Sequence, residues 1–90
     1  MKTAVRKELE TLRGMVLTWK ESYLGWAHSQ GGGEFLAQEF LGEIEQLVYP
    51  YVRRMYQCDY LSHAEASEFL DFCYRQVQEL RDALRGTEAR

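Results

Sequence analysis

Two cysteines and two histidines are the side chains of this 90-residue chain best suited to bind a metal. Cys58 and His63 form a C-x4-H pair, the spacing of half a zinc site, and His28 and Cys73 complete the set. The helices predicted below place His28 at the opposite end of a bundle from Cys58 and His63. They also place Cys73 about 15 Å from the turn that carries Cys58, too far for a disulfide. We therefore predict no metal site and no cofactor, and we interpret both cysteines as small buried hydrophobic residues.

A hydrolytic site needs a nucleophile, a base and an orienting group within hydrogen-bond reach. The chain offers serines at positions 22, 29, 62 and 67. No strand-turn-helix elbow is predicted to present any of them, and the carboxylates fall mainly on polar helix faces. Both histidines flank turns, where a solvated side chain is expected. We therefore predict no catalytic residue and expect that the protein is not an enzyme.

Glycines 31–33 raise the question of a phosphate-binding loop, because such loops precede a helix. They are followed by Glu34 instead of by lysine and then serine or threonine, and no strand is predicted before them. A helix-turn-helix motif around residues 57–70 is the other candidate. Its second helix would carry Glu65, Glu68 and Asp71, which phosphate repels, and the net charge of the chain is −3. We predict no binding to nucleic acid.

The N-terminus MKTAVRKELE lacks the apolar run of a signal peptide. No apolar stretch approaches the ~18 residues of a membrane span. Two cysteines are too few for a disulfide framework, which suits a reducing compartment. These features predict a cytoplasmic protein that does not bind membranes.

Three helices must position all of these residues. The first is predicted over residues 3–28, where apolar residues alternate at spacings of four and three, as in the seam of a coiled coil. That seam consists of Val5, Leu9, Leu12, Val16, Trp19, Tyr23 and Trp26. Thr3 can cap its start, and SQGGG after His28 predicts a flexible loop.

The second helix is predicted over residues 34–58, with a kink at Pro50. Its apolar register passes through the proline, which favours one bent helix over two shorter ones. The predicted seam is Leu36, Phe40, Ile44, Leu47, Tyr51, Met55 and Cys58. Pro50 removes the hydrogen bond to the carbonyl of Gln46, but it lies on the polar side, where water can satisfy that carbonyl.

The third helix is predicted over residues 63–85. Ser62 and Glu65 have the spacing of a capping box, and Leu61 is placed to contact Ala66 as a hydrophobic staple. Gly86 suits a C-terminal stop, and residues 86–90 are expected to fray. Helices of matched length joined by short loops predict an all-α, up-down-up antiparallel three-helix bundle. Residues 1–90 are expected to form a single domain that pairs into a dimeric bundle.

The chain has more apolar side chains than a three-helix core can bury, and exposed aromatic area usually marks a partner surface. The predicted partner-binding residues are Tyr49, Val52, Tyr56, Phe69, Phe72, Met15, Trp19 and Trp26. Lys20 falls inside the apolar arc of the first helix. It is expected to extend its ammonium group to water or, less favourably, to meet a carboxylate across an interface.

These features predict a small non-enzymatic helical module for protein–protein interaction, an adaptor, chaperone or regulatory subunit that acts as a homodimer. A small-ligand or cofactor-binding bundle is the alternative. In that case Trp19, Tyr23, Trp26 and Tyr51 would line a cavity instead of packing as a core.

Overall fold

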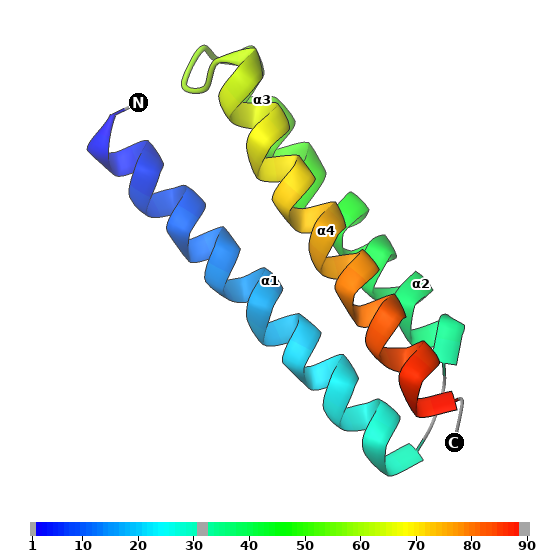
Figure 1. Ribbon diagram of the computed structural model, residues 1–90. Helices are drawn as coiled ribbons and strands as arrows, with labels where there is room; N and C mark the ends of the chain where they lie inside the picture. Colours follow the sequence, from blue (N-terminus) through cyan, green and yellow to red (C-terminus); the bar gives the residue numbers. More distant parts are fainter. Residues whose placement is uncertain (1, 31–32, 89–90) are drawn as a thin grey trace.

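The computed structural model describes residues 2–30 and 33–88 and contains three long helical segments, of which the first and the last run parallel and the middle one runs antiparallel to both (Figure 1). The first is α1 (Thr3–Gln30) and the last is α4 (His63–Glu88). The middle segment runs without interruption through α2 (Gly33–Glu43), η1 (Ile44–Val48) and α3 (Tyr49–Gln57). The described residues contain no strand and extend over 47 × 18 × 17 Å. The predicted all-α, up-down-up three-helix bundle is confirmed. Residues 31 and 32 of the predicted glycine loop lie outside the described residues.

α1 buries most of the predicted seam, with one correction at its C-terminal end. Trp26 was predicted as a core residue but is 60% exposed, and Ala27 is buried in its place. An α-helix has about 3.6 residues per turn, so a strict seven-residue repeat drifts about 20° per heptad. Over the three heptads from Val5, this drift carries Trp26 out of the core and onto the edge of α1.

Pro50 shapes the middle segment through the turn that precedes it. A proline has no N–H to donate and its ring clashes with the carbonyl four residues back. Here the chain widens into the π-helix η1, and the N–H of Tyr49 donates to the carbonyl of Ile44. Pro50 then lies in the first turn of α3, where no intrahelical donor is required. The prediction that the helix continues through Pro50 is correct, and the irregularity lies on its N-terminal side.

The π-helix changes which residues face the core. A π turn holds one more residue than an α turn, so the residues after it are displaced by about one position relative to a regular helix. Leu47 and Tyr51, predicted as core residues, are exposed at 58% and 42%, whereas Val48 and Val52 are fully buried. Cys58 was also predicted to be buried and is exposed, because it ends the helix at the turn.

The turn into α4 follows the predicted capping box. The N–H of Ser62 donates to Oε1 of Glu65 at 2.8 Å, and the N–H of Glu65 donates to Oγ of Ser62 at 3.1 Å. These bonds lower the pKa of the Glu65 carboxyl. Asp59 precedes the box with a positive φ of 63°, a conformation that Asp tolerates better than most residues. Leu61 is buried, as expected of the staple residue.

α4 extends further than predicted. It continues through Gly86 to Glu88, so Gly86 does not end the helix and residues 86–88 are not frayed. A glycine inside a helix costs only about 1 kcal/mol relative to alanine, and it ends a helix only where the backbone turns left-handed. Residues 89–90 of the predicted tail lie outside the described residues.

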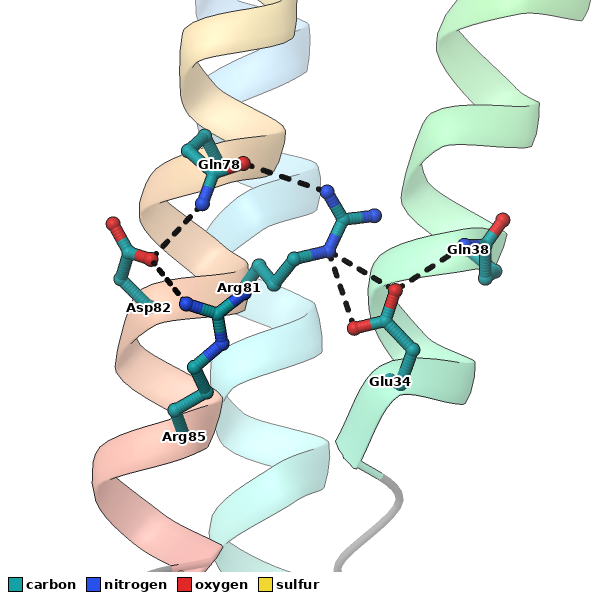
Figure 2. Close-up of polar contacts among 6 residues, drawn as sticks. All are labelled: Glu34, Gln38, Gln78, Arg81, Asp82 and Arg85. Carbon is teal, nitrogen blue, oxygen red and sulfur yellow. Dashed lines mark hydrogen bonds and ion pairs between the residues drawn. The ribbon is translucent and has the colours of Figure 1, made fainter.

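Ion pairs tie α4 to the other two helices. Lys20 of α1 donates to Oε1 of Glu79 at 2.7 Å and to Oε1 of Gln76 at 3.0 Å. Lys20 therefore meets a carboxylate of its own chain, and the prediction that it extends to water is wrong. At the other junction, Arg81 reaches from α4 to Glu34 on α2, with Nε 3.0 Å from Oε1, as Figure 2 shows. This guanidinium lowers the pKa of the Glu34 carboxyl.

None of the helices in residues 2–30 and 33–88 is both long enough and apolar enough to cross a lipid bilayer.

Candidate interaction surface

Three of the eight predicted partner-binding residues are used within the monomer. Val52 and Phe69 are buried in the core, so their prediction as surface residues is wrong. Val52 turns inward because of the π-helix, and Phe69 packs beside Phe72 with ring centroids 6.0 Å apart. Phe72 is half-buried, and the guanidinium carbon of Arg13 lies 4.2 Å from its ring centroid. This cation–π contact packs α1 against α4.

Tyr49 and Tyr56 lie exposed on the edge of α3 that faces α4. Together with His63 they line a groove of about 260 Å³. The rings of Tyr56 and His63 meet edge to face, with centroids 5.9 Å apart. Both tyrosines are accessible, as predicted, and their role as a partner contact stays a prediction.

Trp19 and Trp26 lie together on the opposite side, in a groove between α1 and α2. This groove has a volume of about 430 Å³ and is lined by Trp19, Ser22, Tyr23, Trp26, Phe35, Leu36, Glu39 and Glu43. We call it the carboxylate groove, since its polar rim includes two glutamates. Phe35 is 65% exposed, so the groove presents the side chains of large aromatic residues to solvent.

A second groove, also of about 430 Å³, lies between the other end of α1 and α3. It is lined by Ala4, Val5, Glu8, Tyr51, Arg54, Met55, Cys58 and Tyr60. We call it the arginine groove, because Arg54 is the one positive charge among the residues that line it. Tyr51 and Tyr60 are both exposed.

Two apolar residues connect the grooves. Leu47 lies four residues after Glu43 and four before Tyr51, which places it on the same edge of the middle segment. Met15 lies four residues before Trp19, on the matching edge of α1. Both side chains are exposed. We infer from this spacing that the two grooves and these residues form one strip along α1 and the middle segment, which we call the open face. Six of the ten exposed large hydrophobic residues of the described chain lie on it, namely Met15, Trp26, Phe35, Leu47, Tyr51 and Tyr60.

Sequence reasoning identified the α1 side of the open face and missed its centre on the other side. Leu47 and Tyr51 were assigned to the core because a regular helix would place them there. The signal that could have corrected this was Pro50, since a proline in a helix interior can be accommodated by a π turn in the preceding residues.

The carboxylate groove contains a perturbed acid. The hydroxyl of Tyr23 donates to Oε1 of Glu43, and the Tyr23 ring packs on Phe40 with centroids 5.5 Å apart. Partial burial raises the pKa of the Glu43 carboxyl. This combination of aromatic rings and carboxylates suits a positively charged group, because rings and carboxylates both attract cations.

The Glu43→Gln substitution is expected to stabilise the protein at neutral pH. The folded state holds the Glu43 proton more tightly than the unfolded chain, so ionisation of this carboxyl lowers the free energy of unfolding as the pH rises through and above 4.5, its usual pKa. Glutamine keeps an acceptor for Tyr23 and carries no charge. Urea unfolding of both proteins between about pH 3.5 and 7 measures the difference, which should vanish at the acidic end.

Glu45→Gln is the matched control, since it removes an exposed carboxylate two residues away that does not line the carboxylate groove, and all three proteins are compared at concentrations where they are monomeric. A constant difference between wild type and Glu43→Gln over the whole pH range would contradict the assignment.

The remaining candidate groups do not assemble into a chemical site. Cys58 and Cys73 are both free, and burial raises the pKa of the Cys73 thiol to about 11. A thiol with such a pKa is a poor nucleophile at neutral pH. Within the described residues, no three His, Cys, Asp or Glu side chains gather to hold a metal ion.

Comparison of the chain with protein-family models, with curated proteins and with solved structures gave no match. Its function must therefore be inferred from its own surface.

Proposed function

We propose that the protein is a small non-enzymatic interaction module that forms a homodimer through the open face. The observation that carries this proposal is the concentration of exposed apolar side chains on one face, with Leu47 at its centre. Contiguous apolar patches of this kind are rare on monomers and usually mark an interface. A second copy of the chain is the simplest partner, because a two-fold axis allows the face to cover itself.

The open face has the composition of a specific interface. Its exposed residues include tryptophan, phenylalanine, tyrosine and methionine, which are enriched in interface cores. The two grooves offer concave sites at either end, and aromatic anchors in such sites dominate binding energy. The open face thus combines anchors, grooves and a central leucine on rigid helices.

Substitution of Leu47 by aspartate is expected to convert the dimer into a monomer. In a symmetric dimer the residue occurs twice near the axis, so two carboxylates would be desolvated close together. Size-exclusion chromatography with light scattering, run over a range of concentrations, measures the change. Leu17→Asp is the matched control, because Leu17 is exposed on α1 outside the open face and its variant should remain dimeric. A wild-type protein that stays monomeric at high micromolar concentration would refute the homodimer.

Tyr49 and Tyr56 provide a second surface that the dimer leaves free, which suits an adaptor, chaperone or regulatory subunit. They lie on the α4 edge of α3, away from the open face. If substitution of both by serine dissociates the dimer and Leu47→Asp does not, the dimer uses this edge and the open face is available to another protein.

A small-ligand-binding bundle is the second candidate, and the volume of the carboxylate groove favours it. At about 430 Å³ this groove falls within the range of ligand pockets. Trp19, Tyr23 and Trp26 line it and Tyr51 lines the other groove, so the four residues expected to line a ligand cavity do not share one. Native mass spectrometry of protein purified from its own host tests this function, which a retained ligand would support.

We also propose a cytoplasmic location, supported by two unpaired cysteines, one of which is exposed.

A further inference from the structure

The open face is electrically asymmetric along its length. Glu39 and Glu43 lie in the carboxylate groove at one end, and Arg54 lies with the single carboxylate Glu8 in the arginine groove at the other, so the first end is negative and the second has no net charge. The ion pairs found in the described residues are Lys20–Glu79, Glu34–Arg81 and Asp82–Arg85. Arg54 and Glu39 take part in none of them. A positive charge and a negative charge are thus both left unpaired on the same face of the monomer.

The centre of the open face can be located from its grooves. Glu8 of α1 and Arg54 of α3 line the same groove, so they lie at the same level along the bundle. Met15 comes seven residues after Glu8, and Leu47 comes seven residues before Arg54. Because α1 and the middle segment run antiparallel (Figure 1), we infer from these equal spacings that Met15 and Leu47 lie at about the same level. They mark the midpoint between the two grooves.

The charges are spaced almost evenly about this midpoint. Arg54 lies about 10 Å beyond Leu47 along the helix, and Glu39 and Glu43 lie on average about 9 Å before it. A two-fold axis that crosses the face at Leu47 exchanges its two ends. It therefore places Arg54 of one copy at the level between Glu39 and Glu43 of the other.

We propose that the homodimer is antiparallel, with Arg54 of each copy held in the carboxylate groove of its partner. This inference rests on the proposed homodimer and specifies its geometry. The recognised group is a guanidinium, supplied by a second copy of the chain.

The carboxylate groove matches the chemistry of a guanidinium. Carboxylates accept paired hydrogen bonds from its planar fork, and indole faces attract its charge. The same chain already uses this kind of contact at the α1–α4 junction, where Arg13 stacks on Phe72. In the proposed dimer, Trp19 and Trp26 offer equivalent faces to Arg54 beside Glu39.

Charge exchange tests the proposal. Arg54→Glu and Glu39→Arg are each expected to raise the dissociation constant of the homodimer at least about tenfold, because each variant faces like charges at both ends. An equimolar mixture of the two variants should recover the wild-type affinity. In that heterodimer, Arg54 of one variant faces Glu39 of the other at one end. At the second end, glutamate at position 54 faces arginine at position 39, so opposite charges meet at both ends. Sedimentation velocity measures all three associations.

Arg53→Glu is the matched control. It makes the same change in charge at the neighbouring residue, which is exposed, lies about 100° further around α3, and lines the groove with Tyr49 and Tyr56 instead of the arginine groove. The dissociation constant of the Arg53→Glu homodimer should stay within about threefold of that of the wild type, since exposed charges outside an interface contribute little to its binding free energy. Circular dichroism should show all of these variants folded, because Arg53, Arg54 and Glu39 are exposed.

Cross-linking gives an independent test of direction. Cys58 lies eleven residues beyond Leu47, so in the antiparallel dimer the two Cys58 residues are separated by about 30 Å along the bundle. A short bismaleimide should therefore not join them. In a Cys58→Ser background, Leu47→Cys lies near the axis and should be joined to its own copy.

The results separate the two proposals. A monomeric wild type refutes the homodimer and this inference with it. A wild-type dimer that tolerates Arg54→Glu, or that is cross-linked through Cys58, refutes only the antiparallel arrangement and leaves the homodimer standing.

Discussion

Substitution of Val48 by aspartate is expected to unfold the protein, whereas aspartate at the neighbouring Leu47 should leave the monomer folded. Val48 is fully buried in the core and Leu47 is 58% exposed, although both belong to the same π-helix. An unpaired carboxylate at Val48 would cost several kcal/mol, comparable with the ~5–15 kcal/mol that stabilises a typical domain. Circular dichroism in water and urea unfolding at neutral pH measure both variants.

Alanine at the same two positions provides a milder matched pair. Val48→Ala should lower the free energy of unfolding by about 2 kcal/mol, from lost apolar burial and the cavity left behind. Leu47→Ala should lower the intrinsic stability of the monomer by less than about 0.5 kcal/mol, as for other surface substitutions. Measurement at protein concentrations low enough to populate the monomer separates this effect from dimerisation. If Leu47 proved to be the sensitive position, the middle segment would be a regular α-helix and the open face would lose its centre.

Phe40→Ala is expected to be the most destabilising of the apolar truncations, at about 3–5 kcal/mol. Phe40 is the largest of the fully buried side chains, and its ring packs on Tyr23, which joins α2 to α1. For a domain of about this size, each kcal/mol corresponds to about 4–8 °C in melting temperature. Differential scanning calorimetry should therefore show a fall of at least about 12 °C.

Phe35→Ala is the control for Phe40→Ala. It removes the same number of atoms from the same helix, but Phe35 is 65% exposed on the carboxylate groove. Its melting temperature should change little at concentrations where the protein is monomeric. Equal losses at the two positions would show that the carboxylate groove is filled in solution and that Phe35 belongs to the core.

The helices were predictable because their signals are local. The alternation of four and three along α1 and the Ser62–Glu65 capping box both follow from short-range geometry, and the structure contains both elements. The errors arose where small deviations accumulate or where one residue changes the register. Trp26 left the core because the seam drifts over three heptads. Leu47 and Tyr51 left it because the π-helix precedes Pro50.

The interaction surface was less predictable, because exposure at a helix edge depends on which neighbour covers it. Phe72 and Tyr49 both lie on flanks of their helices, yet Arg13 covers Phe72 and nothing comparable lies over Tyr49 among the described contacts. Periodicity along one helix carries no information about such coverage. The pairing of Lys20 with Glu79 likewise depends on a contact across 59 residues of sequence.

Pro50 determines which side chains of the middle segment are exposed on the protein surface. The middle segment contains two overlapping apolar patterns. One passes through Leu47 and Tyr51, and the other passes through Val48 and Val52. Either could serve as a helix interior, and the missing backbone donor of one proline decides between them. The slimmer valines are thereby kept inside, and the leucine and tyrosine are presented to other molecules. A residue that contributes no side chain to the open face thus determines what that face displays.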